Sequence, residues 1–169
     1  MNKTAIIIPS RLDAKRLPGK PLKLINNKEM ILHVYEAAKK SNSGEVYVAT
    51  PDKKIINLIQ DNGGKAVLTS LSHQTGTDRV YEVFKNQLKN VPDIVVNLQG
   101  DMPNIDPKAI SNLVTYMSSG KCDIATLASS FSSDKEIEDS NNVKVEVKEK
   151  LENNQFGQAA DFFRTNTKK

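Results

Sequence analysis

The chain is poor in several residue types on which common kinds of protein depend. Its 169 residues include a single cysteine, Cys122, and no tryptophan, and aromatic residues make up only 5%. One cysteine cannot form an internal disulfide, which excludes a disulfide-stapled fold and agrees with a reducing compartment. Few aromatic rings are available for the stacking platforms that bind single-stranded nucleic acid. No apolar run approaches the roughly 20 residues that a membrane-spanning helix needs.

Charge and the N-terminal residues further limit the kinds of protein that this chain can be. The formal net charge is +4, but the lysines are spread over many segments instead of one face, so we expect no nucleic-acid partner. The first residues lead directly into an apolar run and lack the basic, apolar and small-residue order of a signal peptide. We therefore expect a soluble cytoplasmic protein that needs no membrane. The length fits one domain, which we predict to span residues 1–169.

Apolar runs alternate with helical patterns along most of the chain. Strands are predicted over residues 4–8, 45–50, 65–69, 93–98 and 123–128. Helical spacing predicts four helices between them, over residues 30–38 and 52–60 and from near Thr77 and Asp106 onward. Repeated strand-helix-strand units favour an α/β fold of three layers, with a mostly parallel sheet covered by helices on both faces.

Local signals mark helix ends and the last part of the chain. Thr77 and Asp78 are predicted to cap the third helix, and Asp106 is predicted as the N-cap of the fourth, with Pro107 in its first turn. Alternating residues predict a further strand over 143–147, at a sheet edge. Residues 151–169 predict no element.

The loop after the first strand is rich in cations. Residues 9–22 read Pro-Ser-Arg-Leu-Asp-Ala-Lys-Arg-Leu-Pro-Gly-Lys-Pro-Leu. In an open parallel sheet the ligand binds outside the carboxyl ends of the strands, and arginine and lysine there suit phosphate oxygens. The loop is not a Walker A motif, because Gly19-Lys20 is followed by proline. A merely solvated basic loop is the alternative.

Two more polar loops follow predicted strands. Residues 73–79, His-Gln-Thr-Gly-Thr-Asp-Arg, precede a helix whose free amide groups favour anions, although Thr77 can also be a plain cap. His73 is predicted to be structural, because no second histidine or cysteine is placed to join it on a metal. Residues 97–103, Asn-Leu-Gln-Gly-Asp-Met-Pro, put Asp101 where it can hold Mg²⁺ together with a substrate phosphate, or act as a turn residue. Together the three loops predict a site for a nucleoside triphosphate and Mg²⁺.

At these loops the chain resembles the bacterial 3-deoxy-manno-octulosonate (Kdo) cytidylyltransferases, or CMP-Kdo synthetases, which are nucleotidyltransferases with a Rossmann-like core. The family's isoleucine-rich strand, Pro-Ser/Ala-Arg and Arg-Leu-Pro-Gly-Lys-Pro-Leu pattern is matched over residues 6–22. Its His-Gln-Ser/Thr-Gly-Thr-Asp/Glu-Arg segment is matched over 73–79, and its Asn-x-Gln-Gly-Asp-Glu-Pro segment over 97–103. Met102 departs from this pattern, because the family has glutamate there.

The resemblance implies an activity and roles for particular residues. The activity is cytidylyl transfer from CTP to Kdo, giving CMP-Kdo and pyrophosphate for lipopolysaccharide biosynthesis. Arg11, Arg16 and Lys20 would grip the triphosphate as catalytic residues, and Asp101 would hold Mg²⁺. The remaining implied contacts are Gln99 with the sugar or nucleotide, and a cytidine border of Pro9, Ser10, Gly76, Thr77 and Arg79.

The resemblance also implies parts that residues 1–169 do not match. The family pattern continues through an acceptor-sugar segment, a Val-Asp-Thr-Pro-Glu motif with a second Mg²⁺ ligand, and elements that usually build a homodimer. We therefore expect the nucleotide-binding part of a C-terminally truncated chain, without the acceptor-binding part and the dimer-forming segment. Two alternatives are an inactive nucleotide-binding remnant and another acid-sugar cytidylyltransferase, such as a CMP-sialate synthetase, against which residues 16–22 argue.

Overall fold

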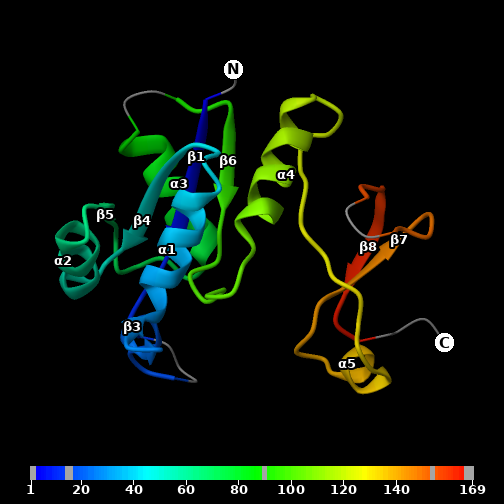
Figure 1. Ribbon diagram of the computed structural model, residues 1–169, viewed down its shortest axis with the longest axis horizontal. Helices are drawn as coiled ribbons and strands as arrows, with labels where there is room; N and C mark the ends of the chain where they lie inside the picture. The colour runs from blue at the N-terminus through cyan, green and yellow to red at the C-terminus, as the bar shows by residue number, and fades with distance from the viewer. Residues whose placement is uncertain (1–2, 14–16, 89–90, 153–154, 166–169) are drawn as a thin grey trace. The chain divides into compact units, whose positions relative to one another are not determined.

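The computed structural model describes residues 3–13, 17–88, 91–152 and 155–165. They form two compact units, Met1–Ala125 and Thr126–Lys169, each of which is treated by itself below (Figure 1). None of the helices in the described part of the chain is both long and apolar enough to cross a membrane.

The first unit is built on a parallel sheet. Its strand order is β5-β4-β1-β6, and the strands are β1 (Thr4–Pro9), β4 (Glu45–Thr50), β5 (Lys65–Leu68) and β6 (Ile94–Asn97). All three pairings are parallel, and β1 lies between β4 and β6. All six residues of β1 are buried, as expected for a strand that is covered on both faces. These four predicted strands are confirmed.

Helices cover both faces of this sheet, as predicted. They are α1 (Met30–Lys40), α2 (Lys53–Asp61), α3 (Gly76–Asn86) and α4 (Pro107–Ser118). Ile6 and Ile8 of β1 pack in one core cluster with residues of α1, α2 and α4. Ala5 and Ile7 point the other way and pack against α3. Right-handed crossovers require this arrangement, because the chain moves outward from β1 to β4 and β5 and then returns past β1 to β6.

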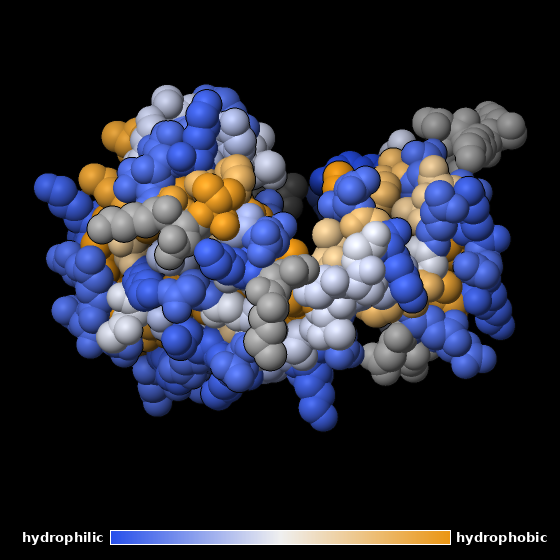
Figure 2. Space-filling model, turned by 90° about the horizontal axis from the view of Figure 1, so that it is seen from above, coloured by the Kyte–Doolittle hydropathy of each residue, from blue (hydrophilic) through white to orange (hydrophobic). Residues whose placement is uncertain are grey.

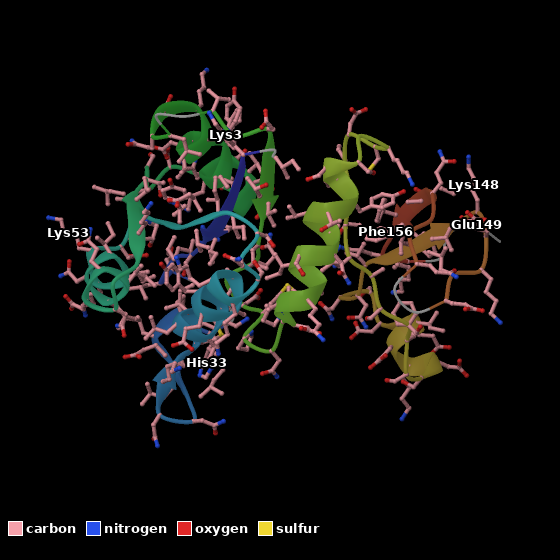
Figure 3. All side chains as sticks on the ribbon, turned by 45° about the horizontal axis from the view of Figure 1, so that its top comes forward. Lys3, His33, Lys53, Lys148, Glu149 and Phe156 are labelled. Carbon is pink, nitrogen blue, oxygen red and sulfur yellow. The ribbon has the colours of Figure 1, made fainter. Side chains whose placement is uncertain are left out.

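A short hairpin, which the sequence pattern did not predict, precedes α1. A 3-10 turn, η1 (Lys20–Leu22), leads into β2 (Leu24–Ile25), which pairs antiparallel with β3 (Lys28–Glu29). Asn26 and Asn27 between them have φ values of 49° and 61°, the left-handed conformation of a type I′ turn. His33 of α1, labelled in Figure 3, shares a hydrogen bond of 2.8 Å between its Nε2 and the Ile25 carbonyl oxygen. The histidine therefore ties the hairpin to the helix.

Of three local predictions that fall in this unit or at its end, two are corrected and one is confirmed. The cap of α3 is Thr75, not Thr77, because the helix begins at Gly76. Asp106 is the N-cap of α4, with Pro107 in the first turn, as predicted. The strand predicted over residues 123–128 is wrong: these residues have no strand assignment, and the Ile124 side chain is 88% exposed. An apolar run becomes a strand only where a neighbour accepts its backbone hydrogen bonds.

The second unit is small and contains its own sheet. α5 (Asp134–Glu138) is followed by β7 (Lys144–Val147), which pairs antiparallel with β8 (Ala159–Phe163). The strand predicted over 143–147 is thus present, but it belongs to this two-stranded sheet, and β8 was not predicted. Lys144 is 5% exposed, and its ammonium donates to the carbonyl oxygens of Asp139, Asn142 and Arg164. These bonds join the loop before β7 to the end of β8.

Apolar side chains remain exposed in patches on an otherwise polar surface. The view in Figure 2 shows a mainly hydrophilic face with scattered hydrophobic areas. In the first unit Val95 of β6 is 38% exposed, and in the second Phe162 of β8 is 53% exposed.

The core of the first unit lies between the sheet and its helices, which leaves the loops at the carboxyl ends of the strands free to form a site.

Candidate functional site

The site lies where the strand order changes direction. From β1 the chain continues to β4 on one side, and β6 arrives on the other. The loops after β1 and β6 therefore leave in different directions and open a crevice at the carboxyl end of the sheet. A cavity of about 340 Å³ lies there. The predicted site residues that line it are Pro9, Ser10, Arg11, Lys20, Gly76, Arg79, Gln99 and Asp101.

Backbone hydrogen bonds hold the start of the basic loop. Ser10 is 8% exposed, and its N–H donates to the Ala49 carbonyl oxygen at 2.9 Å. The Leu12 N–H donates to the Asp52 carboxylate at 2.8 Å, and the Leu12 carbonyl oxygen accepts from the Gly19 N–H at 2.9 Å. Gly19 has φ of 69°, a conformation that glycine adopts without strain. Arg16, a predicted phosphate contact, falls outside the described residues.

Lys20 and Asp101 bind each other across the cavity. The Lys20 Nζ lies 2.8 Å from the Asp101 Oδ2, and their side chains are 36% and 55% exposed. The cation predicted to hold phosphate and the carboxylate predicted to hold Mg²⁺ are therefore adjacent, although they are 81 positions apart in the sequence. A polyanion at Lys20 and a divalent cation at Asp101 would each replace the present partner.

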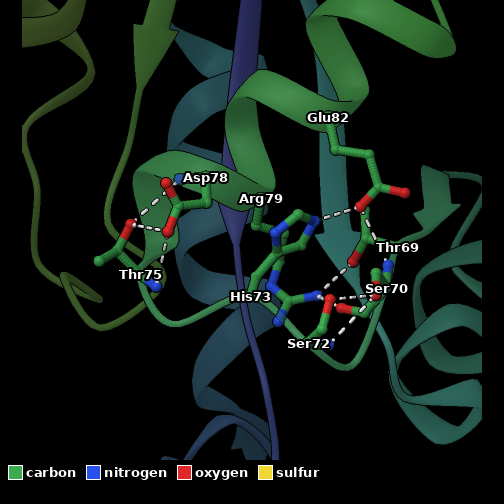
Figure 4. A network of polar contacts seen from close by, with 8 residues as sticks. All are labelled: Thr69, Ser70, Ser72, His73, Thr75, Asp78, Arg79 and Glu82. Carbon is green, nitrogen blue, oxygen red and sulfur yellow. Dashed lines mark hydrogen bonds and ion pairs between the residues drawn. The ribbon is translucent and has the colours of Figure 1, made fainter.

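A capping box begins α3 beside the cavity. The Thr75 Oγ1 accepts from the Asp78 N–H, and the Asp78 carboxylate accepts from both the Thr75 N–H and hydroxyl (Figure 4). These bonds from Thr75 lower the pKa of Asp78. The carboxylate at this helix start offsets part of the attraction of the helix N-terminus for anions.

Arg79 and His73 are held by a polar network in the same loop. Arg79 is 3% exposed, and its guanidinium donates to the Thr69 Oγ1 and the Ser70 carbonyl oxygen. The Glu82 carboxylate bonds with the His73 Nε2 and accepts from the Ser70 N–H (Figure 4). His73 therefore has a hydrogen-bond partner within the protein, as predicted for a structural histidine, and both His73 and Arg79 also line the cavity.

Burial and neighbouring charges shift pKa values in this network. Burial lowers the pKa of Arg79, and the charge of Arg11 lowers it further, while Glu82 and Asp52 oppose the change. Arginine remains charged at neutral pH in any case. Burial raises the pKa of Glu82, but hydrogen bonds from His73 and Ser70 and the charges of His73 and Arg79 together outweigh it, and the net pKa lies below the usual value.

A chain of side-chain amides connects α3 with the loop after β6. The Asn97 Nδ2 donates to the Thr77 Oγ1 at 3.3 Å, and the Asn97 Oδ1 accepts from the Gln99 Nε2 at 3.1 Å. Thr77, a predicted cytidine contact, is not among the residues that line the cavity, whereas Gln99 is. Within the described network Thr77 therefore reaches the cavity only indirectly, through the hydrogen bonds that join it to Asn97 and join Asn97 to Gln99.

Two glycines allow close approach around Pro9. A Cβ added at Gly100 would lie 2.7 Å from the Pro9 carbonyl oxygen, and one at Gly76 would lie 3.2 Å from the Pro9 Cγ. Real Cβ atoms do not approach backbone oxygen so closely, so the loops after β1 and β6 can meet this closely only with glycine at position 100. Gly100 lines the cavity and was not predicted as a site residue.

The sequence pattern missed other contributors as well. Thr75, Gln74 and Met30 line the cavity, and Asp52 anchors the basic loop from outside it. The Ser/Thr-x-x-Asp spacing of Thr75 and Asp78 could have identified the capping box. Asp52 resembles an ordinary helix cap in the sequence, so no local signal connects it with Leu12.

The donor set for a metal is small. Within the residues that the structure describes, no three side chains of His, Cys, Asp or Glu come together as a metal cluster. Asp101 offers one exposed carboxylate at the cavity. Mg²⁺ is commonly bound by one or two carboxylates, substrate phosphates and water, so Asp101 fits Mg²⁺ that arrives with a polyphosphate and does not fit a metal cage made by protein alone.

Comparison with known protein families decides the classification. The family model described as cytidylyltransferase matches residues 5–168. The chain belongs to the cytidylyltransferase family. The predicted resemblance is thereby confirmed, and the three loops of this family member are those that surround the cavity.

Curated relatives carry octulosonate names. The chain is 43% identical over 148 residues to the 8-amino-3,8-dideoxy-manno-octulosonate cytidylyltransferase of Shewanella pealeana, covering 86% of this chain and 60% of that protein. It is 41% identical to the 3-deoxy-manno-octulosonate cytidylyltransferase of Thermodesulfovibrio yellowstonii, covering 84% of this chain and 58% of that protein. The chain thus spans about 60% of the length of these relatives.

Solved structures show the same fold. CMP:2-keto-3-deoxy-manno-octonic acid synthetase complexed with CTP matches with a TM-score of 0.85 at 39% identity, over 96% of this chain and 64% of that one. A cytidylyltransferase from Leptospira borgpetersenii matches with a TM-score of 0.60 at 25% identity, over 72% and 51% of the two chains. The predicted nucleotidyltransferase fold is confirmed.

Proposed function

We propose that this chain is the CTP-binding part of a Kdo cytidylyltransferase. The proposed reaction transfers the cytidylyl group of CTP to the anomeric hydroxyl of Kdo and releases pyrophosphate, giving CMP-Kdo for lipopolysaccharide biosynthesis in the cytoplasm. The observation that carries the proposal is the convergence of three loops on one cavity, with Arg11, Lys20 and Asp101 in its wall. The octulosonate names of the relatives favour this acid sugar over sialate.

Charge gives the proposed nucleotide a direction. Arg11 and Lys20 supply positive charge from the basic loop. At the start of α3 the Asp78 carboxylate is in the first turn, and the Arg79 guanidinium already donates to Thr69 and Ser70. We assign the triphosphate to the basic loop and the cytosine and ribose to the side formed by Gly76, Gln99 and Arg79. Arginine can hold phosphate in a bidentate manner and lysine acts as a point charge, so the two would align the α-phosphate and stabilise charge on its oxygens.

Asp101 is the residue proposed to hold Mg²⁺ with the nucleotide. When bound, the ion would polarise phosphate oxygens and neutralise developing charge. The protein's own part is to place one carboxylate beside Lys20, whose ammonium becomes free for phosphate once Asp101 has another partner. Phosphoryl-type transfer depends mainly on such alignment and charge stabilisation, and no covalent nucleophile is required.

A second candidate function is nucleotide binding without turnover. It is favoured by the small donor set, because among the described residues no three side chains of His, Cys, Asp or Glu come together as a metal cluster. In that case the chain binds CTP and Mg²⁺ but releases no pyrophosphate. The homodimer expected from the family and the residues that bind the acceptor sugar remain predictions.

Calorimetry followed by a turnover assay tests both proposals. We expect the purified chain to bind CTP with Mg²⁺ more tightly than ATP, GTP or UTP, and an R11A variant to lose most of that binding. Pyrophosphate release is then measured with Kdo, 8-amino-3,8-dideoxy-manno-octulosonate or sialate as the acceptor. Release with Kdo supports the transferase, CTP binding without release supports the second candidate, and absence of CTP binding contradicts both.

A further inference from the structure

The Asp52 carboxylate forms a hydrogen bond with the basic loop and not with the helix that Asp52 precedes. It occupies the N-cap position of α2, yet its side chain makes no capping hydrogen bond to that helix. The Oδ2 accepts instead from the Leu12 N–H at 2.8 Å, 40 residues away in the sequence and in the basic loop. Asp52 itself does not line the cavity.

Asp52 is a rigid support because its own backbone is fixed. Its N–H donates to the Thr50 Oγ1 at 3.1 Å, and the Thr50 residue is completely buried at the end of β4. Its carbonyl oxygen accepts from the N–H groups of Ile55 and Ile56 in the first turn of α2. The backbone that carries the carboxylate is thus held between a core strand and a helix that packs on the sheet.

The bond to Leu12 acts on both halves of the basic loop. Leu12 directly follows Arg11, and its carbonyl oxygen accepts from the Gly19 N–H, which precedes Lys20. The Asp52 carboxylate therefore fixes Leu12, which is bonded covalently to Arg11 and through a hydrogen bond to the residue before Lys20. Asp52 is also close enough to oppose the mutual repulsion of Arg11 and Arg79.

We propose that Asp52 is a positioning residue that anchors the basic loop at Leu12 and thereby directs Arg11 and Lys20 into the cavity. The inference rests on the proposed binding of a polyphosphate by that loop. A carboxylate accepting a backbone N–H is stronger than a neutral hydrogen bond, and it removes freedom that the loop would otherwise lose when the ligand binds.

The test compares D52A, D52N and a control. D52A removes the acceptor, D52N keeps an acceptor oxygen without the charge, and D61A removes an exposed aspartate from the far end of α2. Hydrogen exchange of the Leu12 amide, measured by NMR without ligand, reports the anchor directly. Calorimetry with CTP, CMP and inorganic tripolyphosphate reports its effect on the proposed phosphate contacts.

We expect D52A to raise the exchange rate of the Leu12 amide about tenfold and to weaken the binding of CTP and of tripolyphosphate about tenfold, as for loss of a charged hydrogen bond. The binding of CMP should weaken less than threefold, because CMP presents fewer phosphates to the loop. D52N should lose less than D52A in every readout, because it keeps an acceptor oxygen but not the charge that strengthens the bond. D61A should change neither exchange nor binding.

The opposite pattern overturns the inference. An unchanged Leu12 exchange rate in D52A, or equal losses of CTP and CMP, would show that Asp52 only supports the fold. If D52A does not fold, T50V takes its place, because it removes the hydroxyl that orients Asp52. We expect T50V to weaken the binding of CTP and tripolyphosphate more than that of CMP, each by less than in D52A. A T50V variant that binds all three as the unmodified chain does would overturn the inference. The exchange readout needs no nucleotide, so failure of CTP to bind the unmodified chain counts against the proposed function alone.

Discussion

The Lys20 ammonium and the Asp101 carboxylate are each other's partner in the structure, at 2.8 Å. Both groups belong to the proposed site, and both are partly exposed, so the pair contributes at most about 1 kcal/mol and can be exchanged for ligands. A triphosphate that binds Lys20 releases Asp101, and a divalent cation that binds Asp101 releases Lys20. Each ligand therefore prepares the site for the other.

The first prediction follows from this competition. D101N removes the carboxylate that competes for Lys20, so CTP binding without Mg²⁺ should become tighter by up to about fivefold. The gain from adding Mg²⁺ should shrink at the same time. Calorimetry with CTP in EDTA and in Mg²⁺ measures both effects. E45Q breaks another exposed ion pair, Glu45 with Lys65, and should change neither; equal behaviour of the two variants would contradict the exchange.

A second prediction concerns the close approach at Gly100. G100A puts a Cβ 2.7 Å from the Pro9 carbonyl oxygen, so the loops after β1 and β6 must move apart. We expect the free energy of unfolding to fall by about 1–3 kcal/mol and CTP binding to weaken with it. Chemical denaturation and calorimetry measure the two quantities.

Gly63 provides the matched control for this change. It has φ of 70°, and a Cβ there would meet nothing within 4 Å. Asparagine tolerates this left-handed conformation, so G63N should retain stability within about 1 kcal/mol and bind CTP normally. A G100A variant as stable as G63N would show that Pro9 and Gly100 can separate without cost.

The third prediction is a pH dependence that comes from Glu82. Burial raises its pKa, but hydrogen bonds from His73 and Ser70 and the charges of His73 and Arg79 together outweigh burial, so its pKa in the folded protein lies below the usual value. A group with a lowered folded pKa stabilises the fold above its unfolded pKa, about 4.3, and this contribution is lost as the pH falls through the folded pKa. E82Q should therefore flatten the fall of unfolding free energy between about pH 5 and pH 3.

The comparison for that experiment is E138Q, at an exposed position at the end of α5. Urea denaturation at a series of pH values gives the slopes for E82Q, E138Q and the unmodified chain. We expect only E82Q to differ. Parallel curves for all three would mean that the His73–Glu82 contact does not persist in solution.

The parts predicted from the sequence are those that local patterns determine. Four strands and the four helices follow from apolar spacing, and the cavity follows from polar loops at the carboxyl ends of β1, β5 and β6. Asp106 was found as a cap because its partner, the Lys108 N–H, is two residues away. Contacts between residues so close in the sequence can be predicted from the sequence alone.

The parts that were missed depend on partners far apart in the sequence. Leu12 and Asp52 are 40 residues apart, and nothing local indicates that this aspartate serves a loop instead of its helix. Residues 123–128 have the apolar content of a strand, but strand formation needs a neighbour, which composition does not provide. For β8 the reverse holds: pairing with β7 makes a strand of a segment that has no clear alternation.

The last prediction separates two neighbouring threonines. Thr75 caps α3 through its hydroxyl, whereas Thr77 lies within the helix and accepts from Asn97 at 3.3 Å. T75A should lower the free energy of unfolding by about 1 kcal/mol, the usual cost of a lost N-cap, and T77A by less than about 0.5 kcal/mol. Denaturation of both variants measures this difference. A larger loss in T77A than in T75A would return the cap to Thr77, where the sequence pattern placed it, and would require α3 to begin later than Gly76.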